Sequence, residues 1–310
     1  MSFSATAKAE VCRMNTGKEC CELAELSALI HTAGSISISG GAFSLRVDTE
    51  NAAVARRVFA LIKSLYGVQA GTQMHTNQLK HNHIYSLSVD KATARMMAID
   101  TRILGDEGLQ FGSDASFLTS RCCRIAFVRG AFLGGGSITN PEKRYHMEFV
   151  CGQKEFAQGL LNIIVELGVP AKMILRGKSH VVYIKEGDAI VTLLTMMGAH
   201  TSILNIENIR ILKSVRNNVN RKVNCETGNL SKTVNASVRQ QESIEYIRTH
   251  MGLDKLSPAL RQVAEARMSY PEATLEELAA LLGAESKSGI NHKLRKLNSI
   301  AEHLKMTRGK

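Results

Sequence analysis

Apolar positions recur with two different periods along this chain, and the same succession of periods appears twice. Every second side chain is apolar between residues 43 and 47, which is the pattern of a strand with one buried face. Between 54 and 65 the apolar spacing becomes i, i+4, i+7, i+8 and i+11, which predicts an amphipathic helix. A second copy follows 102 positions later, the difference between Cys122 and Cys20. The matched positions are Phe43, Leu45, Val47, Val54, Val58, Leu61, Ile62 and Leu65 in the first copy, and Tyr145, Met147, Phe149, Phe156, Leu160, Ile163, Ile164 and Leu167 in the second.

Each copy extends into a longer unit with the predicted order helix, hairpin, helix, hairpin, helix. Adjacent cysteines begin the first helix of both copies, at Cys20-Cys21 and Cys122-Cys123. Adjacent methionines mark the closing helix, at Met96-Met97 and Met196-Met197, where the offset has slipped to 100. Such a slip indicates surface loops of unequal length. The second hairpins are expected around 68–89 and 169–184.

This duplication predicts the fold class. Repeats at about 20–104 and 122–204 are far longer than solenoid repeats, so we expect two half-domains that share one core within residues 1–204. The chain is then α+β, with a pseudo-twofold duplicated αββαββα domain first. A basic segment over 205–240 and an all-α domain over 241–310 follow it.

The first helix of each copy is rich in small residues. Glycine inside a helix costs about 1 kcal/mol relative to alanine, so their accumulation indicates close helix packing or a helix terminus. A flexible glycine-rich loop is the alternative. A phosphate-binding loop is disfavoured because the Gly-Lys-Ser/Thr ending is missing. The small residues are Ala24, Ala28, Ala33 and Gly34 in one copy, and Ala126, Gly130, Gly134, Gly135 and Gly136 in the other.

These helices resemble the LAGLIDADG motifs of homing endonucleases, through Val128–Ser137 and, in a more degraded form, Leu26–Ser35. The resemblance implies two motif helices packed side by side, each followed by strands of a DNA-binding saddle. It also implies that the metal-holding acids fall on Ala33 and Gly135. Neither residue offers the oxygen ligand that Mg²⁺ requires, so we expect no catalytic residue, no metal, no cofactor and no nuclease activity. His31 could be proposed as a substitute ligand, but a lone histidine on an apolar helix is more often structural.

The segment after the repeats is strongly basic. Residues 208–241 contain seven basic side chains and one acid, Glu226, which gives 7 − 1 = +6. Six asparagines lie among them, and asparagine can donate to phosphate oxygens and to base edges. A solvated polar linker is the alternative, but the position of this segment next to a second motif favours contact with nucleic acid. The residues expected to make it are Arg216, Asn220, Arg221 and Lys222.

That second motif predicts a helix-turn-helix. Ser257-Pro258 begins one helix, and Thr274 with Glu277 forms a capping box for a short helix that Gly283 ends. A third helix follows, with Ile290, Leu294 and Leu297 on one face. The polar side chains expected on its outer face, or beside it, are Lys287, Ser288, Asn291, His292, Arg295 and Lys296.

A buried inner face with a basic outer face is typical of a recognition helix that enters the major groove. Ile290 lies seven positions past Gly283, so the turn is one residue longer than the commonest form. A three-helix interaction module would share the apolar pattern but would not need the basic face. We therefore favour DNA binding.

The order of these parts resembles the WhiA family of regulators in Gram-positive bacteria. Its most specific signature is the segment Arg216–Glu226 followed by Ser286–His292, and the resemblance spans nearly the whole chain. It implies a sequence-specific DNA-binding protein, a transcriptional regulator linked to cell division, chromosome segregation and, in spore formers, sporulation.

Composition narrows the class of partner. The net charge of 39 − 28 = +11 favours a polyanion. Aromatic residues make up 5% with no tryptophan, which disfavours stacking on single strands or RNA, so double-stranded DNA fits better. No apolar stretch is long enough to cross a membrane, and we expect a cytoplasmic, nucleoid-associated protein.

The seven cysteines predict neither a disulfide framework nor zinc spacing, since no C-x-x-C pair is present. We expect them to be reduced and mostly buried, with those of the two repeats packed at the start of each motif helix. A redox sensor is a minor alternative.

Two rival functions stay open. One is a scaffold that recruits division proteins and has only non-specific DNA affinity. The other is a residual homing endonuclease, which Ala33 and Gly135 disfavour. The repeat domain could also engage a protein co-regulator.

Overall fold

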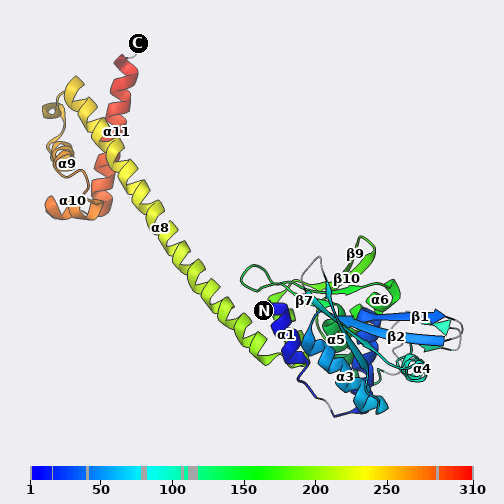
Figure 1. Cartoon of the computed structure of the whole chain (residues 1–310). Helices are drawn as coiled ribbons and strands as arrows, with labels where there is room; N and C mark the ends of the chain where they lie inside the picture. Colours follow the sequence, from blue (N-terminus) through cyan, green and yellow to red (C-terminus); the bar gives the residue numbers. More distant parts are fainter. Residues whose placement is uncertain are drawn as a thin grey trace. The chain divides into compact units, whose positions relative to one another are not determined.

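The two predicted copies adopt the same order of elements in the computed structural model (Figure 1). The first copy comprises α2 (Glu19–Ala33), β1 (Gly34–Ser39), β2 (Ala42–Thr49), α3 (Ala52–Tyr66), β3 (Gly71–Asn77), β4 (Asn82–Ser88) and α4 (Lys91–Asp100). The second comprises α5 (Arg121–Gly135), β7 (Gly136–Ile138), β8 (Met147–Cys151), α6 (Lys154–Glu166), β9 (Lys172–Arg176), β10 (Ser179–Ile184) and α7 (Gly187–Met197). The duplicated αββαββα fold is therefore confirmed.

The structure describes residues 2–15, 17–39, 42–77, 82–105, 108–110, 118–283 and 286–308. The chain divides into two units, 1–212 and 213–310. The first unit also contains a short hairpin of β5 (Leu104–Gly105) and β6 (Gly108–Leu109) between the two copies.

Each copy builds a four-stranded antiparallel sheet, with the order β1-β2-β4-β3 in the first and β7-β8-β10-β9 in the second. Gly34 pairs with Val47 in one sheet, and Gly136 pairs with Phe149 in the other. Both pairs obey the 102-residue offset, since 136 − 34 and 149 − 47 are equal. The duplication thus extends to strand register. Tyr145 differs from the expectation, because β8 begins two residues after it.

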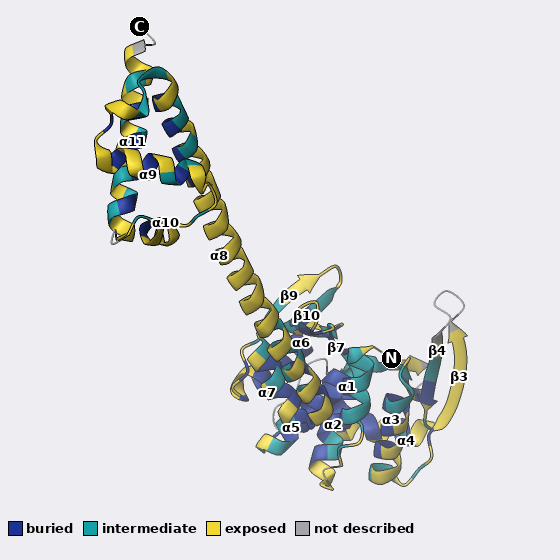
Figure 2. Cartoon of the chain, turned by 90° about the vertical axis from the view of Figure 1, so that its left-hand side faces the viewer, coloured by how far each residue is buried: buried dark blue, intermediate teal, exposed yellow. Residues whose placement is uncertain are grey.

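The core of the first unit lies between the sheets and the helices, and α2 and α5 are buried within it (Figure 2). Their backbones approach so closely that a Cβ added at Gly130 would overlap the carbonyl oxygen of Glu25. A Cβ at Gly134 would overlap the hydroxyl of Thr32. The glycines of α5 therefore serve close helix packing, and the expectation of a packed helix rather than a flexible loop is confirmed.

A buried ionic group joins three helices of this unit. The Glu25 carboxylate on α2 accepts hydrogen bonds from Arg57 Nε on α3 at 2.7 Å and from Arg129 Nη1 on α5 at 3.3 Å. Glu25 is 0% exposed, Arg57 8% and Arg129 3%. Removing one partner of a buried ion pair leaves an uncompensated charge, which lowers the free energy of unfolding by about 3 to 5 kcal/mol. The sequence patterns did not identify these three residues as a group. The repeat does not conserve them, because the position equivalent to Glu25 in the second copy is Phe127 and the position equivalent to Arg129 in the first copy is Ser27.

An N-terminal helix, α1 (Phe3–Val11), packs on the first unit and was not expected. Ala7 and Val11 are fully buried in the core. Lys8 donates from its Nζ to the carbonyl oxygen of Leu133 at 2.9 Å, near the C-terminal end of α5. Burial lowers the pKa of Lys8 to about 8. A cation at this end is favoured because the free carbonyl groups of a helix C-terminus carry partial negative charge.

The second unit is all-α and has its own core. Helix α8 (His200–His250) contributes Ile206 to the first core and Ile244 and Ile247 to the second, so the basic segment 205–240 is helical. A 3-10 turn (Leu253–Lys255) follows, and then α9 (Pro258–Ser269), α10 (Leu275–Leu281) and α11 (Lys287–Arg308).

Gly130→Ala tests the close approach of α2 and α5. The added methyl group has no room against Glu25, so we expect unfolding free energy to fall by about 2 kcal/mol, the usual scale of overpacking. The matched control is Gly228→Ala in α8, where nothing lies within 4 Å of an added Cβ. It should leave stability unchanged or raise it by up to about 1 kcal/mol. Chemical denaturation of both variants measures the difference, and equal effects would contradict the packing argument.

Candidate nucleic-acid interface

Helices α9, α10 and α11 place one polar helix face outward from the second unit. The Thr274 hydroxyl accepts from the Glu277 N–H, and the Glu277 carboxylate accepts from the Thr274 N–H, so the predicted capping box is confirmed. Gly283 ends the turn after α10 with φ +63°, a left-handed conformation that favours glycine. The predicted inner face of α11 is also confirmed, since Ile290, Leu294 and Leu297 are at most 1% exposed.

Arg267 fixes the loop between α9 and α10. Its side chain is 3% exposed, and Nη1 donates to the carbonyl oxygens of Ala273 at 2.6 Å and Pro271 at 3.3 Å. Burial lowers the pKa of this guanidinium. Because the loop sets where α10 begins, these bonds position the helix that α11 packs against. Sequence patterns did not reveal this role, because an arginine at a helix C-terminus usually lies in solvent.

The candidate DNA-contacting residues of α11 share one side of the helix. Ser288, His292, Arg295 and Lys296 are exposed, and Asn291 is half-buried beside them. Lys287 is also exposed and pairs with Glu276 of α10, with Nζ 2.8 Å from the carboxylate. The structure therefore brings together all six residues named from the sequence at the start and outer face of α11.

The candidates on α8 do not share a face. Arg216, Asn220, Arg221 and Lys222 are all exposed. At about 100° per residue, Arg221 lies roughly 140° around the helix from Arg216, and Lys222 lies roughly 240° around. One phosphate backbone running past a straight helix therefore reaches only part of this set.

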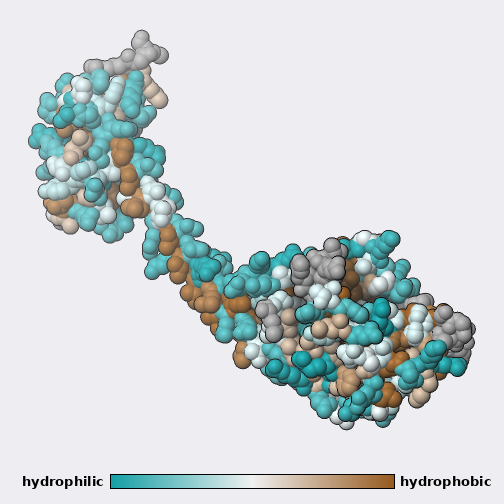
Figure 3. Space-filling view, in the orientation of Figure 1, coloured by the Kyte–Doolittle hydropathy of each residue, from teal (hydrophilic) through white to brown (hydrophobic). Residues whose placement is uncertain are grey.

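Helix α8 instead carries an apolar stripe along its exposed length, visible as brown side chains in Figure 3. Arg221, Lys232 and Arg239 recur on the opposite side at helical spacing. An exposed apolar stripe of this length is characteristic of an interaction surface. The stripe is formed by Leu212, Val215, Val219, Val223, Leu230 and Val234, which are 51–65% exposed.

The two positions that the sequence comparison aligned with metal-binding acids lie at the C-terminal ends of α2 and α5. Ala33 and Gly135 are the last residues of these helices. A side chain at Gly135 would collide with the carbonyl oxygen of Val150. The adjoining surface pocket, about 750 Å³, is lined by Lys8, Arg13 and Arg56 as well as Asp48 and Glu50. This lining includes Gly134 and Gly136 but neither Ala33 nor Gly135, and its three cationic side chains outnumber its two carboxylates.

His31 occupies a structural position. Its ring stacks on Phe156 of α6 with 4.8 Å between centroids. Burial lowers its pKa to about 4, so the imidazole is neutral near pH 7. This arrangement supports the structural interpretation of His31.

The outward faces of the two sheets are nearly balanced in charge. Arg46 on β2 pairs with Asp48 at 3.1 Å, and Arg176 on β9 pairs with Glu148 on β8 at 2.9 Å. Lys172 on β9 adds one exposed cation. One exposed apolar side chain, Ile174 of β9, lies on the same face as Arg176 and is 54% exposed, whereas the adjacent Leu175 points to the opposite face of the sheet. A duplex needs uncompensated cations, which these strands provide sparsely.

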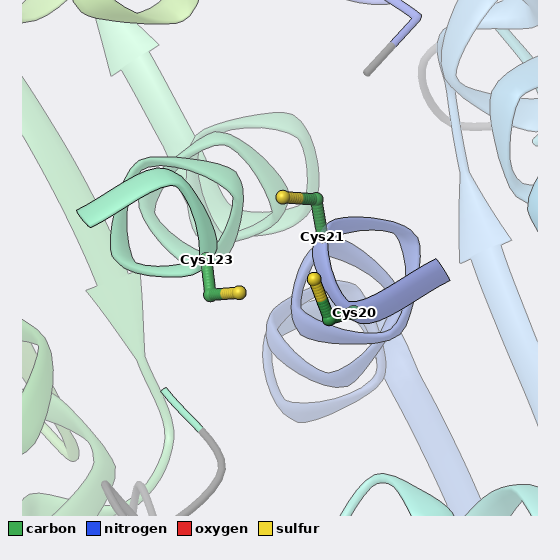
Figure 4. A group of neighbouring side chains, drawn as sticks. All are labelled: Cys20, Cys21 and Cys123. Carbon is green, nitrogen blue, oxygen red and sulfur yellow. The ribbon is translucent and has the colours of Figure 1, made fainter. Parts of the chain in front are cut away.

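The cysteines at the start of α2 and α5 form a cluster (Figure 4). The expectation that the cysteines are mostly buried is wrong, because only Cys21, Cys123 and Cys151 are buried among the seven, all of which are described. The Ser120 hydroxyl and then the Cys21 thiol lower the pKa of Cys122 to about 7 by hydrogen bonding, while burial raises that of Cys21. Spacing rules missed this cluster because its members come from two helices. The repeated Cys-Cys pair was the available signal.

Comparisons with known proteins cover all three parts of the chain. Residues 19–104 match the model of the WhiA N-terminal LAGLIDADG-like domain, and residues 124–216 match that of the WhiA LAGLIDADG-like domain. Residues 219–301 match the model of the WhiA C-terminal HTH domain. Among the described residues, no helix combines the length and apolar composition needed to cross a bilayer.

Relatives match along the full length. A "Probable cell division protein WhiA" of Alkaliphilus oremlandii is 45% identical over 98% of this chain and 98% of its own. The protein of the same name from Clostridium botulinum strain Eklund 17B is 46% identical over 98% and 99%. The crystal structure of full-length DUF199/WhiA from Thermatoga maritima is similar in fold, with a TM-score of 0.61 and 25% identity over 98% of this chain and 99% of that one.

The neutral His31 predicts a pH dependence of stability. Its pKa is about 4 when folded and near 6.5 when unfolded, so the unfolded state binds the proton more readily between these values. The contribution of the neutral His31 to the free energy of unfolding is complete above about pH 6.5 and is lost as the pH falls toward 4, by about 3 kcal/mol in total. His31→Phe keeps an aromatic ring on Phe156 but cannot be protonated, so its free energy of unfolding should fall less between pH 6.5 and pH 4. The exposed His75 supplies the control, since His75→Gln should leave the profile unchanged, and urea titrations across pH measure both.

Proposed function

The chain belongs to the WhiA family, and on that premise we propose that it is a sequence-specific DNA-binding protein that regulates transcription and has no nuclease activity. The observation that carries the proposal is the outer face of α11, where Ser288, His292, Arg295 and Lys296 are exposed together. Arginine reads guanine, and asparagine reads adenine, through paired hydrogen bonds in the major groove. A helix that is apolar inside and basic outside supplies this chemistry on a rigid support.

Helix α8 adds the sequence-independent part of the affinity in this proposal. Arg221, Lys232 and Arg239 lie on one side of the helix, at spacings of 11 and 7 residues that bring them roughly into line. Cations in such a row neutralise phosphates and release counterions, which makes affinity fall with salt. Arg216 and Lys222 flank the apolar stripe and belong to a different surface.

The proposal extends to the cell. The relatives carry the name of a probable cell division protein, and we assign this chain a role in cell division and chromosome segregation, with sporulation where the organism forms spores. Double-stranded DNA as its partner implies a location at the nucleoid in the cytoplasm. The absence of nuclease activity rests on Ala33 and Gly135, which provide no ligand for a divalent cation.

A second candidate role concerns the sheets of the first unit. We propose that their outward face engages a protein co-regulator rather than DNA. The paired Arg46 and Arg176, together with the exposed Ile174, support this assignment. Apolar side chains beside neutralised charges are typical of protein interfaces, whereas a phosphate backbone requires free cations.

Arg295→Ala tests base recognition by α11. On duplexes that the full-length protein selects from a random library, we expect binding to weaken by about 1 to 3 kcal/mol, roughly 5- to 150-fold. On scrambled duplexes the loss should be much smaller. Arg248→Ala removes the same charge from an exposed position on α8 and should affect both duplexes weakly and equally. Fluorescence anisotropy gives the affinities, and an equal loss on both duplexes for Arg295→Ala would make it a phosphate contact instead.

The double substitution Arg46→Ala with Arg176→Ala tests the role of the sheets. We expect full-length protein carrying it to keep its DNA affinity within a factor of about 2, and to keep the slope of log K against log salt. Each lost phosphate contact would reduce the slope by about 0.9. A reduced slope would therefore show that the sheets contact DNA. Arg221→Ala is the positive control and should lower the slope.

A further inference from the structure

The N-terminal ends of α2 and α5 bring four thiols together. The sulfur atoms of Cys20, Cys21 and Cys123 all lie within 4.8 Å of one another (Figure 4). Cys122 lies beside this group, because its sulfur and that of Cys123 are each 3.0 Å from the Ser120 hydroxyl oxygen.

The cluster follows the pseudo-twofold symmetry of the fold. The 102-residue offset relates Cys20 to Cys122 and Cys21 to Cys123. The equivalent starts of α2 and α5 therefore bring both cysteine pairs to the same junction of the two helices. Three sulfur atoms already lie close enough together to share one ion, and the fourth, that of Cys122, lies next to that of Cys123.

We propose that Cys20, Cys21 and Cys123 bind one thiophilic divalent cation of the zinc type as thiolate ligands, and that Cys122 supplies the fourth thiolate. Zinc takes four sulfur ligands in tetrahedral geometry at about 2.3 Å, which places the sulfur atoms about 3.8 Å apart. From separations of at most 4.8 Å, the sulfurs of Cys20, Cys21 and Cys123 each need to move by no more than about 1 Å, and side-chain rotation brings the sulfur of Cys122 to them from its place beside Ser120. Binding transfers no electrons, because each thiol releases its proton to solvent as its sulfur joins the metal.

Soft sulfur ligands select the ion. Four thiolates favour zinc over Mg²⁺ or Ca²⁺, which prefer oxygen ligands. Both cysteine pairs also occupy the first turn of a helix, where the free N–H groups favour a negative charge. The Ser120 hydroxyl lies 3.0 Å from the sulfurs of both Cys122 and Cys123 and can donate to a thiolate.

The burial of the four residues suits a bound ion. Cys21 and Cys123 are buried, so the inner side of the site is shielded from water. Cys20 is exposed and Cys122 is half-buried, so an ion can enter from solvent. The site would join the two motif helices at the ends opposite to Ala33 and Gly135, and its occupancy would add to the stability of the first unit.

Metal analysis of the full-length protein tests the proposal. Protein purified with a thiol reductant, saturated with ZnCl₂ and dialysed should retain one zinc per chain by mass spectrometry of the metal. Cobalt in place of zinc should give the intense visible absorption of tetrahedral cobalt thiolate. Zinc should also raise the melting temperature. Magnesium as the chloride should produce none of these effects.

Substitution identifies the ligands. Cys20→Ser with Cys122→Ser changes the two accessible members and keeps the buried pair, so the variant should fold but lose the stoichiometric zinc and the cobalt spectrum. Cys225→Ser removes an exposed cysteine of α8 and should retain both. Circular dichroism confirms folding of each variant.

Three results would overturn the proposal. The first is wild-type protein that retains no zinc after dialysis. The second is full zinc retention by the folded Cys20→Ser, Cys122→Ser variant. The third is a disulfide among these cysteines, detected by peptide mass in protein kept with reductant, because a disulfide would remove the thiolates that the ion needs.

Discussion

The direct contact between the backbones of α2 and α5 is the constraint on which the first unit depends. Gly130 lies against the Glu25 carbonyl group, and no side chain fits between them. Because the helices are this close, Glu25 can reach the guanidinium group of Arg129 on α5 as well as that of Arg57 on α3. A wider spacing would separate the buried charges, which are stable only when paired.

The same contact brings both ends of the helix pair together, and the two ends have different chemistry. At the C-terminal ends, Ala33 and Gly135 stand where the resemblance to homing endonucleases would place acids, and Lys8 binds the Leu133 carbonyl oxygen. At the N-terminal ends, the sulfurs of Cys20, Cys21 and Cys123 lie within 4.8 Å of one another. Soft sulfur ligands are therefore gathered at one end of the helix pair, while Ala33 and Gly135 offer no side-chain oxygen ligand at the other end.

The two units have different roles in the proposed function. The second unit presents a rigid basic helix face, held by its own apolar core and by Arg267, which fixes the loop before α10. The first unit presents sheets whose arginines are already paired with acids. In this proposal, specific recognition of DNA belongs to α11, and the duplicated unit contacts protein. The apolar stripe on α8 exposes hydrophobic side chains to water, which is unfavourable and is characteristic of a surface that contacts a partner.

The sequence by itself determined the duplication, the strand and helix periods, the loss of the acids and the capped helices of the second unit. The periods and the helix caps are local patterns, which local hydrogen bonding and burial preferences suffice to specify. The duplication and the missing acids follow from comparing residue types position by position, which needs no structure. Only the tertiary structure decided what lies side by side. Glu25 and Arg129 meet across 104 residues, and cysteines of the two repeats meet across two helices. Such relations depend on how helices pack and turn, and spacing along the chain does not contain that information.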